Sequence, residues 1–92
     1  MKISLRMFGQ FRHQFGGERE LEVSPGMTPR EVLEVLVEGS ADGRFALFDE
    51  EGQIRSHIML MVNRERIARE AHGTVILHEA DELAVLPPVA GG

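Results

Sequence analysis

The feature that most restricts how this 92-residue chain can fold is a strongly marked helix start about one third of the way along it. Thr28 can cap the helix, Pro29 suits the first helical position, and Glu31 completes a capping box with Thr28. Gly39 is placed to end the helix. Its apolar residues have the spacing of a single stripe and are Val32, Leu33, Leu36 and Val37. A helix with one apolar face needs a second layer to cover it.

Two segments before this helix alternate between polar and apolar residues, which is the pattern of half-buried strands. They are residues 2–8 (KISLRMF) and 18–23 (ERELEV), and the glycine-rich stretch 9–17 between them is predicted to be a loop. Such an arrangement predicts a hairpin. The side chains expected to face the core are Ile3, Leu5, Met7, Leu21 and Val23.

Two further strands are expected after the helix. Residues 57–62 (HIMLMV) are apolar nearly throughout, which predicts a third and central strand. Met59 and Met61 share a face of that strand and are predicted to fill gaps in the core. Residues 83–86 (LAVL) form the last predicted strand, which the two prolines that follow would end.

The stretch between the helix and the third strand is the least regular. Residues 40–57 show no clear period, although Phe45, Leu47 and Phe48 supply apolar mass and 49–52 read as a turn. The order of strand, strand, helix, strand and strand predicts an α+β fold with a mixed sheet and one main helix. The β-grasp of ubiquitin has this order. We therefore expect residues 1–92 to be one ubiquitin-like domain, with 87–92 as a projecting tail.

Composition excludes several classes of function. The chain has no cysteine, which rules out disulfides, thiolate zinc sites and a cysteine nucleophile. The net charge is −5 and the arginines are dispersed, which argues against nucleic acid as a partner. No apolar run approaches the roughly 20 residues that cross a membrane, and the N-terminus lacks a signal-peptide pattern, so a cytoplasmic protein is expected. The histidines lack metal-ligand spacing, and His13 and His72 are predicted on the surface.

The last six residues, Pro87-Pro88-Val89-Ala90-Gly91-Gly92, combine a stiff stalk with a slender tip. Two prolines favour an extended path, and glycines without Cβ atoms pass through narrow channels. The reactive group at the tip is the carboxylate of Gly92, which is a poor electrophile until it is activated, most plausibly by adenylation. The chain has no phosphate-binding loop motif, so a partner enzyme must handle ATP.

Nine of the ten basic residues are arginine, and Lys2 is the only lysine. A GC-rich genome explains this bias, since either residue serves on most surfaces. The functional alternative is that a protein with an activated carboxylate gains by presenting few amines to attack it.

The run 81–92 (DELAVLPPVAGG) closely resembles the C-terminus of the ubiquitin-like sulfur-carrier family (the ThiS/MoaD type), especially the small subunit of molybdopterin synthase. The first strand with Phe8, the helix 28–38 and Val62-Asn63 before a turn are also similar to that family. Two positions depart from the family pattern. Ala80 stands where the family often has glycine before the last strand, and Arg64 where glycine often follows the asparagine.

The resemblance implies a mechanism and partners. An adenylyltransferase similar to ubiquitin-activating enzymes would use ATP to activate Gly92, and a persulfide donor would convert it to a thiocarboxylate. The large subunit of a molybdopterin synthase, or another sulfur acceptor enzyme, would then receive the sulfur. This chain would be a non-catalytic co-substrate that binds no cofactor of its own.

Three alternatives stay open at this level. Thiazole or cysteine biosynthesis would use the same tail with a different acceptor. A protein modifier would form an isopeptide bond through Gly92. The tail could also be incidental to a plain interaction domain. Contacts beside Pro87 and Pro88 would orient the tail in a partner, and Phe8 is the first candidate for an exposed anchor there, the alternative being that Phe8 packs in the core.

Overall fold

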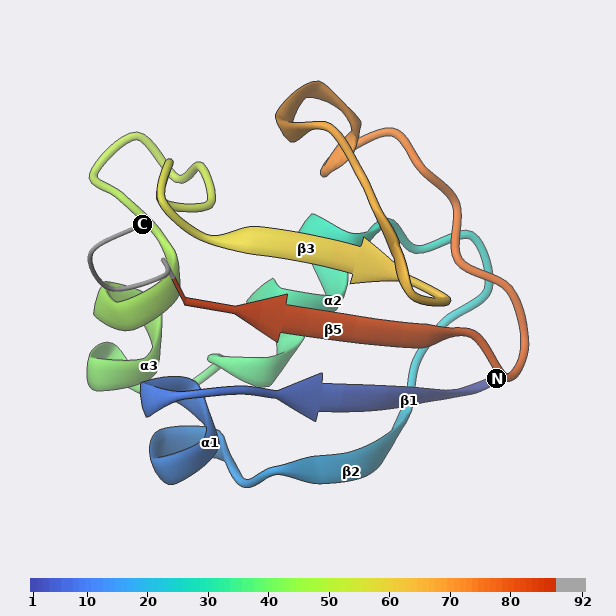
Figure 1. The fold of residues 1–92 in the computed structure, drawn as a ribbon, viewed down its shortest axis with the longest axis horizontal. Helices are drawn as coiled ribbons and strands as arrows, with labels where there is room; N and C mark the ends of the chain where they lie inside the picture. Colours follow the sequence, from blue (N-terminus) through green and yellow to red (C-terminus); the bar gives the residue numbers. More distant parts are fainter. Residues whose placement is uncertain (88–92) are drawn as a thin grey trace.

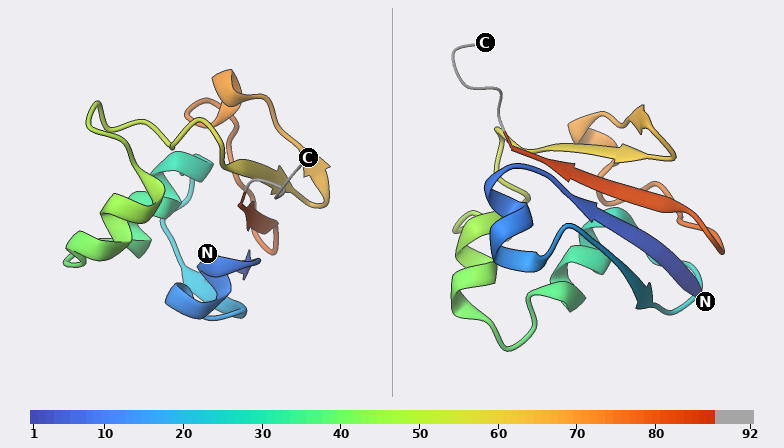
Figure 2. Two further views of the ribbon diagram at one scale, coloured as in Figure 1. Left: turned by 60° about the vertical axis from the view of Figure 1, so that its left-hand side comes forward. Right: turned by 60° about the horizontal axis from the view of Figure 1, so that its bottom comes forward.

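The computed structural model describes residues 1–87 and contains a five-stranded mixed sheet with helices packed on one of its faces (Figures 1 and 2). The strands are β1 (Lys2–Met7), β2 (Glu18–Glu22), β3 (Met59–Val62), β4 (Glu65–Arg66) and β5 (Glu82–Leu86). The helices are α1 (Gln10–Phe15), α2 (Pro29–Leu36), α3 (Ala41–Leu47) and the 3₁₀ turn η1 (Arg69–Ala71). The strand order β2-β1-β5-β3-β4, with β5 parallel to β1, is the predicted β-grasp architecture.

The hairpin of β1 and β2 is confirmed. The two strands pair antiparallel, with Ile3 opposite Leu21 and Leu5 opposite Arg19. The prediction of a simple loop at 9–17 is wrong, because α1 occupies most of it. Phe11 and Phe15 lie one helical turn apart, and burial of Phe11 with partial burial of Phe15 holds this short helix against the core.

The predicted start of α2 is confirmed in atomic detail. The Glu31 backbone N–H donates to the Thr28 hydroxyl at 3.3 Å, and the Thr28 backbone N–H donates to the Glu31 carboxylate at 3.0 Å. This reciprocal pair satisfies two donors that the first helical turn leaves free. Pro29 occupies the first turn, where its missing N–H costs no hydrogen bond.

The core lies between α2 and the sheet. Leu33 of α2 is fully buried with Leu5 of β1, Leu60 of β3 and Val85 of β5. Leu36 is only partly buried, so it packs at the margin of the core. The apolar stripe of the helix therefore faces the sheet as predicted, with Val32, Leu33 and Val37 buried.

Two expectations for the third strand are wrong. The central strand is β5, whose residues Leu83, Ala84 and Val85 are all buried, whereas β3 lies between β5 and the short β4. Met59 and Met61 are half-buried on the face opposite Leu60. Leu60 pairs with the buried Val85 and points to the core, so the alternation of a strand turns both methionines away from it.

The stretch 40–57 contains a helix that periodicity did not reveal. The Ser40 hydroxyl accepts the Gly43 N–H at 3.0 Å and caps α3. Of the three apolar residues expected to add core mass, Leu47 and Phe48 are buried but Phe45 is 74% exposed. The predicted turn at 49–52 is confirmed by a hydrogen bond from the Gly52 N–H to the Asp49 carbonyl at 3.1 Å.

Both departures from the family pattern lie at left-handed backbone positions. Ala80 has φ +70° and Arg64 has φ +69°, a region that costs a non-glycine residue about 1 kcal/mol. The Asn63 side chain offsets part of this cost by joining the turn to β5. Its amide donates to Asp81 Oδ1 and its carbonyl accepts from the Glu82 N–H, both at 2.9 Å.

The predicted surface position of His72 is wrong, since its exposed fraction is 6%. It follows η1, and its carbonyl accepts a hydrogen bond from the Arg30 N–H at 2.9 Å, which draws it against the start of α2. Burial first, and then the charges of Arg69 and Arg30, hold the pKa of the imidazole below its ordinary value.

We expect His72 to make the fold less stable in mildly acidic solution. Because the folded pKa lies below that of the unfolded chain (about 6.5), the unfolded state takes up the proton first. The stability that the neutral His72 side chain contributes is fully present above the unfolded pKa, and it is lost as the pH falls toward the folded pKa. Urea unfolding at pH 7.5 and 5.5 measures this loss. His72→Gln should remove this loss of unfolding free energy between pH 7.5 and 5.5. His13→Gln is the control at an exposed position and should leave the loss unchanged. Equal pH dependence in all three proteins would contradict the assignment to His72.

Candidate functional site

The face of the sheet that the helices leave open carries an apolar patch at the end where β5 finishes. Cross-strand partners share a face, and the register pairs Met59 with Leu86 and Met61 with Ala84. Phe8 follows β1 at the same end, and its N–H donates to the Val85 carbonyl at 3.2 Å. We define the apolar patch as Phe8, Met59, Met61, Ala84 and Leu86.

Phe8 lies at the border between the patch and a charged strip. It is half-buried, and it is not a member of the core cluster. The Arg6 guanidinium lies over its ring, 5.2 Å from the ring centroid. Phe8 lies on the open face of the sheet, which no helix of residues 1–87 covers. Its ring is therefore accessible to a partner protein. The alternative of a core position for Phe8 is therefore wrong.

The charges beside the patch form a small network centred on Arg6. Arg6 pairs with Glu18 at 3.4 Å and with Glu82 at 3.8 Å, and Arg64 pairs with Glu82 at 3.6 Å. Pairs this exposed contribute little to stability. Their consequence is that guanidinium groups border the apolar side chains, since Arg66 also lies opposite Met61.

The base of the tail contacts the start of α1. A Cβ atom at Gly9 would lie 2.6 Å from Pro87 Cγ, so only glycine fits at this approach. Gly9 also has φ +58°, which favours glycine independently. The contact places the exit of the tail directly beside Phe8. The remaining predicted tail residues, namely Pro88, Val89, Ala90, Gly91 and Gly92, lie outside the described residues.

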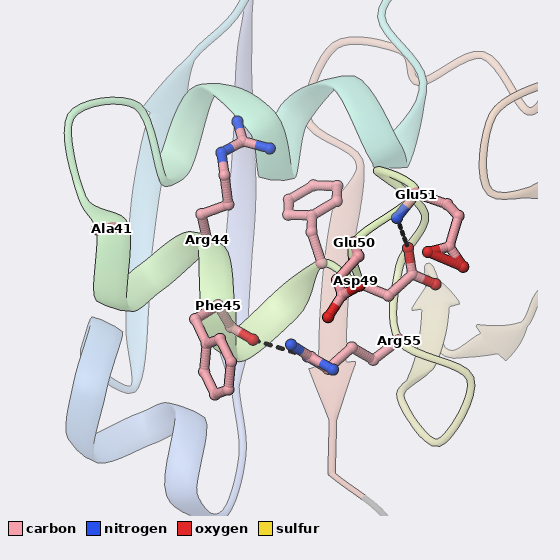
Figure 3. A pocket seen from close by; sticks show the side chains of 8 residues that line it. Ala41, Arg44, Phe45, Asp49, Glu50, Glu51 and Arg55 are labelled. Carbon is pink, nitrogen blue, oxygen red and sulfur yellow. Dashed lines mark hydrogen bonds between the residues drawn. The ribbon is translucent and has the colours of Figure 1, made fainter.

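A hollow of about 790 Å³ lies between α3 and the loop 48–55 (Figure 3). The Arg55 guanidinium lies 4.7 Å from the Phe45 ring centroid, and its Nε donates to the Phe45 carbonyl at 2.7 Å. Arg44 lies over the ring of Phe48 in the same way, at 5.1 Å. Neither Phe8 nor Pro87, the two predicted site residues that the structure describes, lines the hollow. The sequence did not predict this hollow, because Phe45 was expected to pack in the core.

Residues 1–87 hold no group of three histidine or acidic side chains that could bind a metal ion. Within the same residues, no helix has the length and apolar character that crossing a bilayer requires.

The sequence model of the ThiS family matches residues 5–92, which is nearly the whole chain and includes the tail. The chain belongs to the ThiS family. Its members include ubiquitin-like sulfur carriers and protein modifiers, so the predicted family and fold are confirmed.

Similar proteins cover the ThiS-family chain from end to end. Small archaeal modifier protein 3 of Haloferax volcanii is 30% identical over 100% of both chains. The crystal structure of SAMP1 from Haloferax volcanii superposes with a TM-score of 0.79 at 26% identity, again over 100% of both chains. A chain of the BexX/CysO complex from Amycolatopsis orientalis gives a TM-score of 0.72 at 28% identity, over 98% of this chain and 99% of that one.

Proposed function

We propose that this ThiS-family chain is a sulfur carrier whose Gly92 carboxylate is adenylated, converted to a thiocarboxylate and used as sulfur donor in molybdopterin (molybdenum or tungsten cofactor) biosynthesis. The observation that carries the proposal is the position of Pro87, the base of the tail. Pro87 follows β5 and lies beside the half-buried Phe8 and the apolar patch, which charged side chains border. A partner that binds the patch therefore meets the base of the tail next to its binding surface.

The chemistry at Gly92 needs two steps. The carboxylate attacks the α-phosphorus of ATP on the adenylyltransferase, and pyrophosphate leaves. The terminal sulfur of a persulfide then attacks the carbonyl carbon and AMP leaves, after which a second thiol of the donor cleaves the S–S bond. The product is a terminal thiocarboxylate. Because the chain has no cysteine, no thiol on it competes for the activated carbonyl.

The proposal assigns distinct roles to the tail residues. Gly92 carries the reactive group. Gly91 has no Cβ atom and therefore fits a narrow channel of the partner enzyme. Ala90 and Val89 span the entrance of the partner's active site, and Pro87 and Pro88 hold the chain extended at its base. The acceptor is the large subunit of a molybdopterin synthase, which performs the sulfur transfer.

Co-expression with the adenylyltransferase and a persulfide donor tests this function by intact mass. A thiocarboxylate in place of the carboxylate adds about 16 Da. Transfer to a purified large subunit that holds its pterin precursor must then return the mass to that of the free acid. A carrier for thiazole or cysteine biosynthesis would gain the same mass and fail at this second step. A chain that gains no mass when the donor system is active on a known carrier would overturn the proposal.

Protein modification is a second candidate, favoured by one observation. The relative that is 30% identical over its whole length is named as a small archaeal modifier protein. In this case the activated Gly92 would form an isopeptide bond to a lysine of another protein. Conjugates would appear in the host as higher-mass species that contain this chain.

Phe8→Ala is expected to weaken binding to the adenylyltransferase and to the acceptor by about 1–3 kcal/mol, as truncation of an interface anchor does. The melting temperature should stay nearly unchanged, because Phe8 lies outside the core. Titration calorimetry and thermal melts measure both quantities. Phe45→Ala is the matched control, since Phe45 is an exposed aromatic residue outside the patch. A similar loss of affinity in both variants would show that the effect is not specific to the patch.

A further inference from the structure

The amines of this chain decide where an activated copy could react with a second copy. An acyl-adenylate or thioester is attacked by primary amines, and the sequence supplies two, the α-amine of Met1 and the ε-amine of Lys2. In water a free α-amine is in general a better nucleophile near neutral pH than a lysine ε-amine, because a larger share of it is unprotonated.

The fold holds the α-amine in place. It donates a hydrogen bond to the Val23 carbonyl at 2.9 Å and forms an ion pair with Glu22 at 3.1 Å. The Met1 side chain is only 11% exposed. An amine bound to a carbonyl and a carboxylate in this way must break both contacts before its lone pair can attack.

Lys2 lies free by comparison. It is exposed, and within residues 1–87 its ammonium makes no ion pair shorter than 4.0 Å. Its strand position also separates it from the tail. β1 and β5 are parallel, so Lys2 at the start of β1 and Pro87 after β5 lie at opposite ends of the sheet (Figure 1). Six residues of β1 span about 20 Å between these ends.

We propose that Lys2 is the acceptor amine through which one copy of this chain is acylated by another, giving a head-to-tail Gly92–Lys2 linkage. The Lys2 nitrogen attacks the activated carbonyl, an amide bond forms, the bond to AMP or thiol breaks, and the lysine proton leaves with that group. The linkage joins different surfaces of the two copies and does not close on itself, so further copies can add. This inference rests on the proposed activation of Gly92.

The test uses the full chain with a Gly92 thioester of 2-mercaptoethanesulfonate, made by intein fusion, incubated alone at pH 8. We expect covalent dimers and longer species by intact mass. Trypsin cuts last after Arg69, so the acceptor peptide 1–6 must carry the branch 70–92 on Lys2. Linkage through Met1 would instead leave the bond after Lys2 open to trypsin. The two acceptors are thereby distinguished in one digest.

Lys2→Arg should lower the dimer yield at least about tenfold, because only the held α-amine remains. Adding Glu22→Gln to that variant removes the ion pair and should restore part of the yield through Met1. An undiminished yield in Lys2→Arg, a wild-type branch on Met1, or a cyclic monomer would overturn the inference. The thioester needs no enzyme, so these outcomes leave the proposed function standing. A missing thiocarboxylate in the co-expression experiment would overturn that function and not the reactivity of Lys2.

Discussion

Deletion of Gly91 and Gly92 is expected to abolish adenylation of the chain and to leave its melting temperature within about 1 °C of the wild-type value. The reason is that the reactive carboxylate moves two residues back and then ends on Ala90, whose Cβ does not fit where Gly92 is proposed to bind. Stability is unaffected because the core described by residues 1–87 is complete without the two glycines. ATP–pyrophosphate exchange on the adenylyltransferase and calorimetric melting measure the two effects.

Gly91→Val distinguishes the steric fit of residue 91 in the partner's channel from the length of the tail. The variant keeps all 92 residues and the terminal Gly92, so the carboxylate stays at its original distance from Pro87. A branched side chain should still lower the exchange rate steeply, since it adds Cβ and two methyl groups inside the channel. Wild-type exchange in this variant would refute the narrow channel. Exchange in the deletion variant would refute the role of Gly92 itself.

Leu33→Ala is expected to lower the free energy of unfolding by about 2–5 kcal/mol, a large share of the stability of a domain of this size. Leu33 is fully buried on α2 against Leu5, Leu60 and Val85, so truncation leaves a cavity that rigid neighbours cannot fill. Leu36→Ala should cost less, because Leu36 is only partly buried. Urea unfolding monitored by circular dichroism measures both.

The neighbouring position on the same helix supplies the control for this measurement. Val35 is 41% exposed, and Val35→Ala should change the unfolding free energy by less than about 0.5 kcal/mol. Equal costs at 33 and 35 would mean that the helix presents a different face to the sheet. The paired measurement therefore tests the register of α2 and not only its existence.

The β-grasp order was predictable because its main signals are local. The capping box of α2 uses hydrogen bonds between Thr28 and Glu31, which are three residues apart, and both partners are visible in the sequence. The β1–β2 hairpin follows from the alternation of two neighbouring segments. The proposed role of the tail rests on equally local signals, since the properties of Gly91 and Gly92 need no partner elsewhere in the chain.

The two short helices were missed because contacts distant in the sequence stabilise them. α1 has six residues, too few for a clear period, and becomes helical because Phe11 finds a place in the core. α3 places Leu47 inside and Phe45 outside, and the exposed Phe45 is held by Arg55, ten residues further on. Apolar character alone does not distinguish Leu47, which is buried, from Phe45, which is exposed.

The sequence by itself determined the fold class, the start of α2 and the hairpin, because each depends on neighbouring residues. Only the tertiary structure decided which strand is central, which face Met59 and Met61 occupy, and that Phe8 lies outside the core. It also decided that Met1 is held by Glu22 and Val23, whereas the Lys2 ammonium makes no ion pair with any side chain of residues 1–87. Each of these depends on which distant strand or side chain becomes a neighbour, and the pairing of β5 between β1 and β3 sets those neighbours.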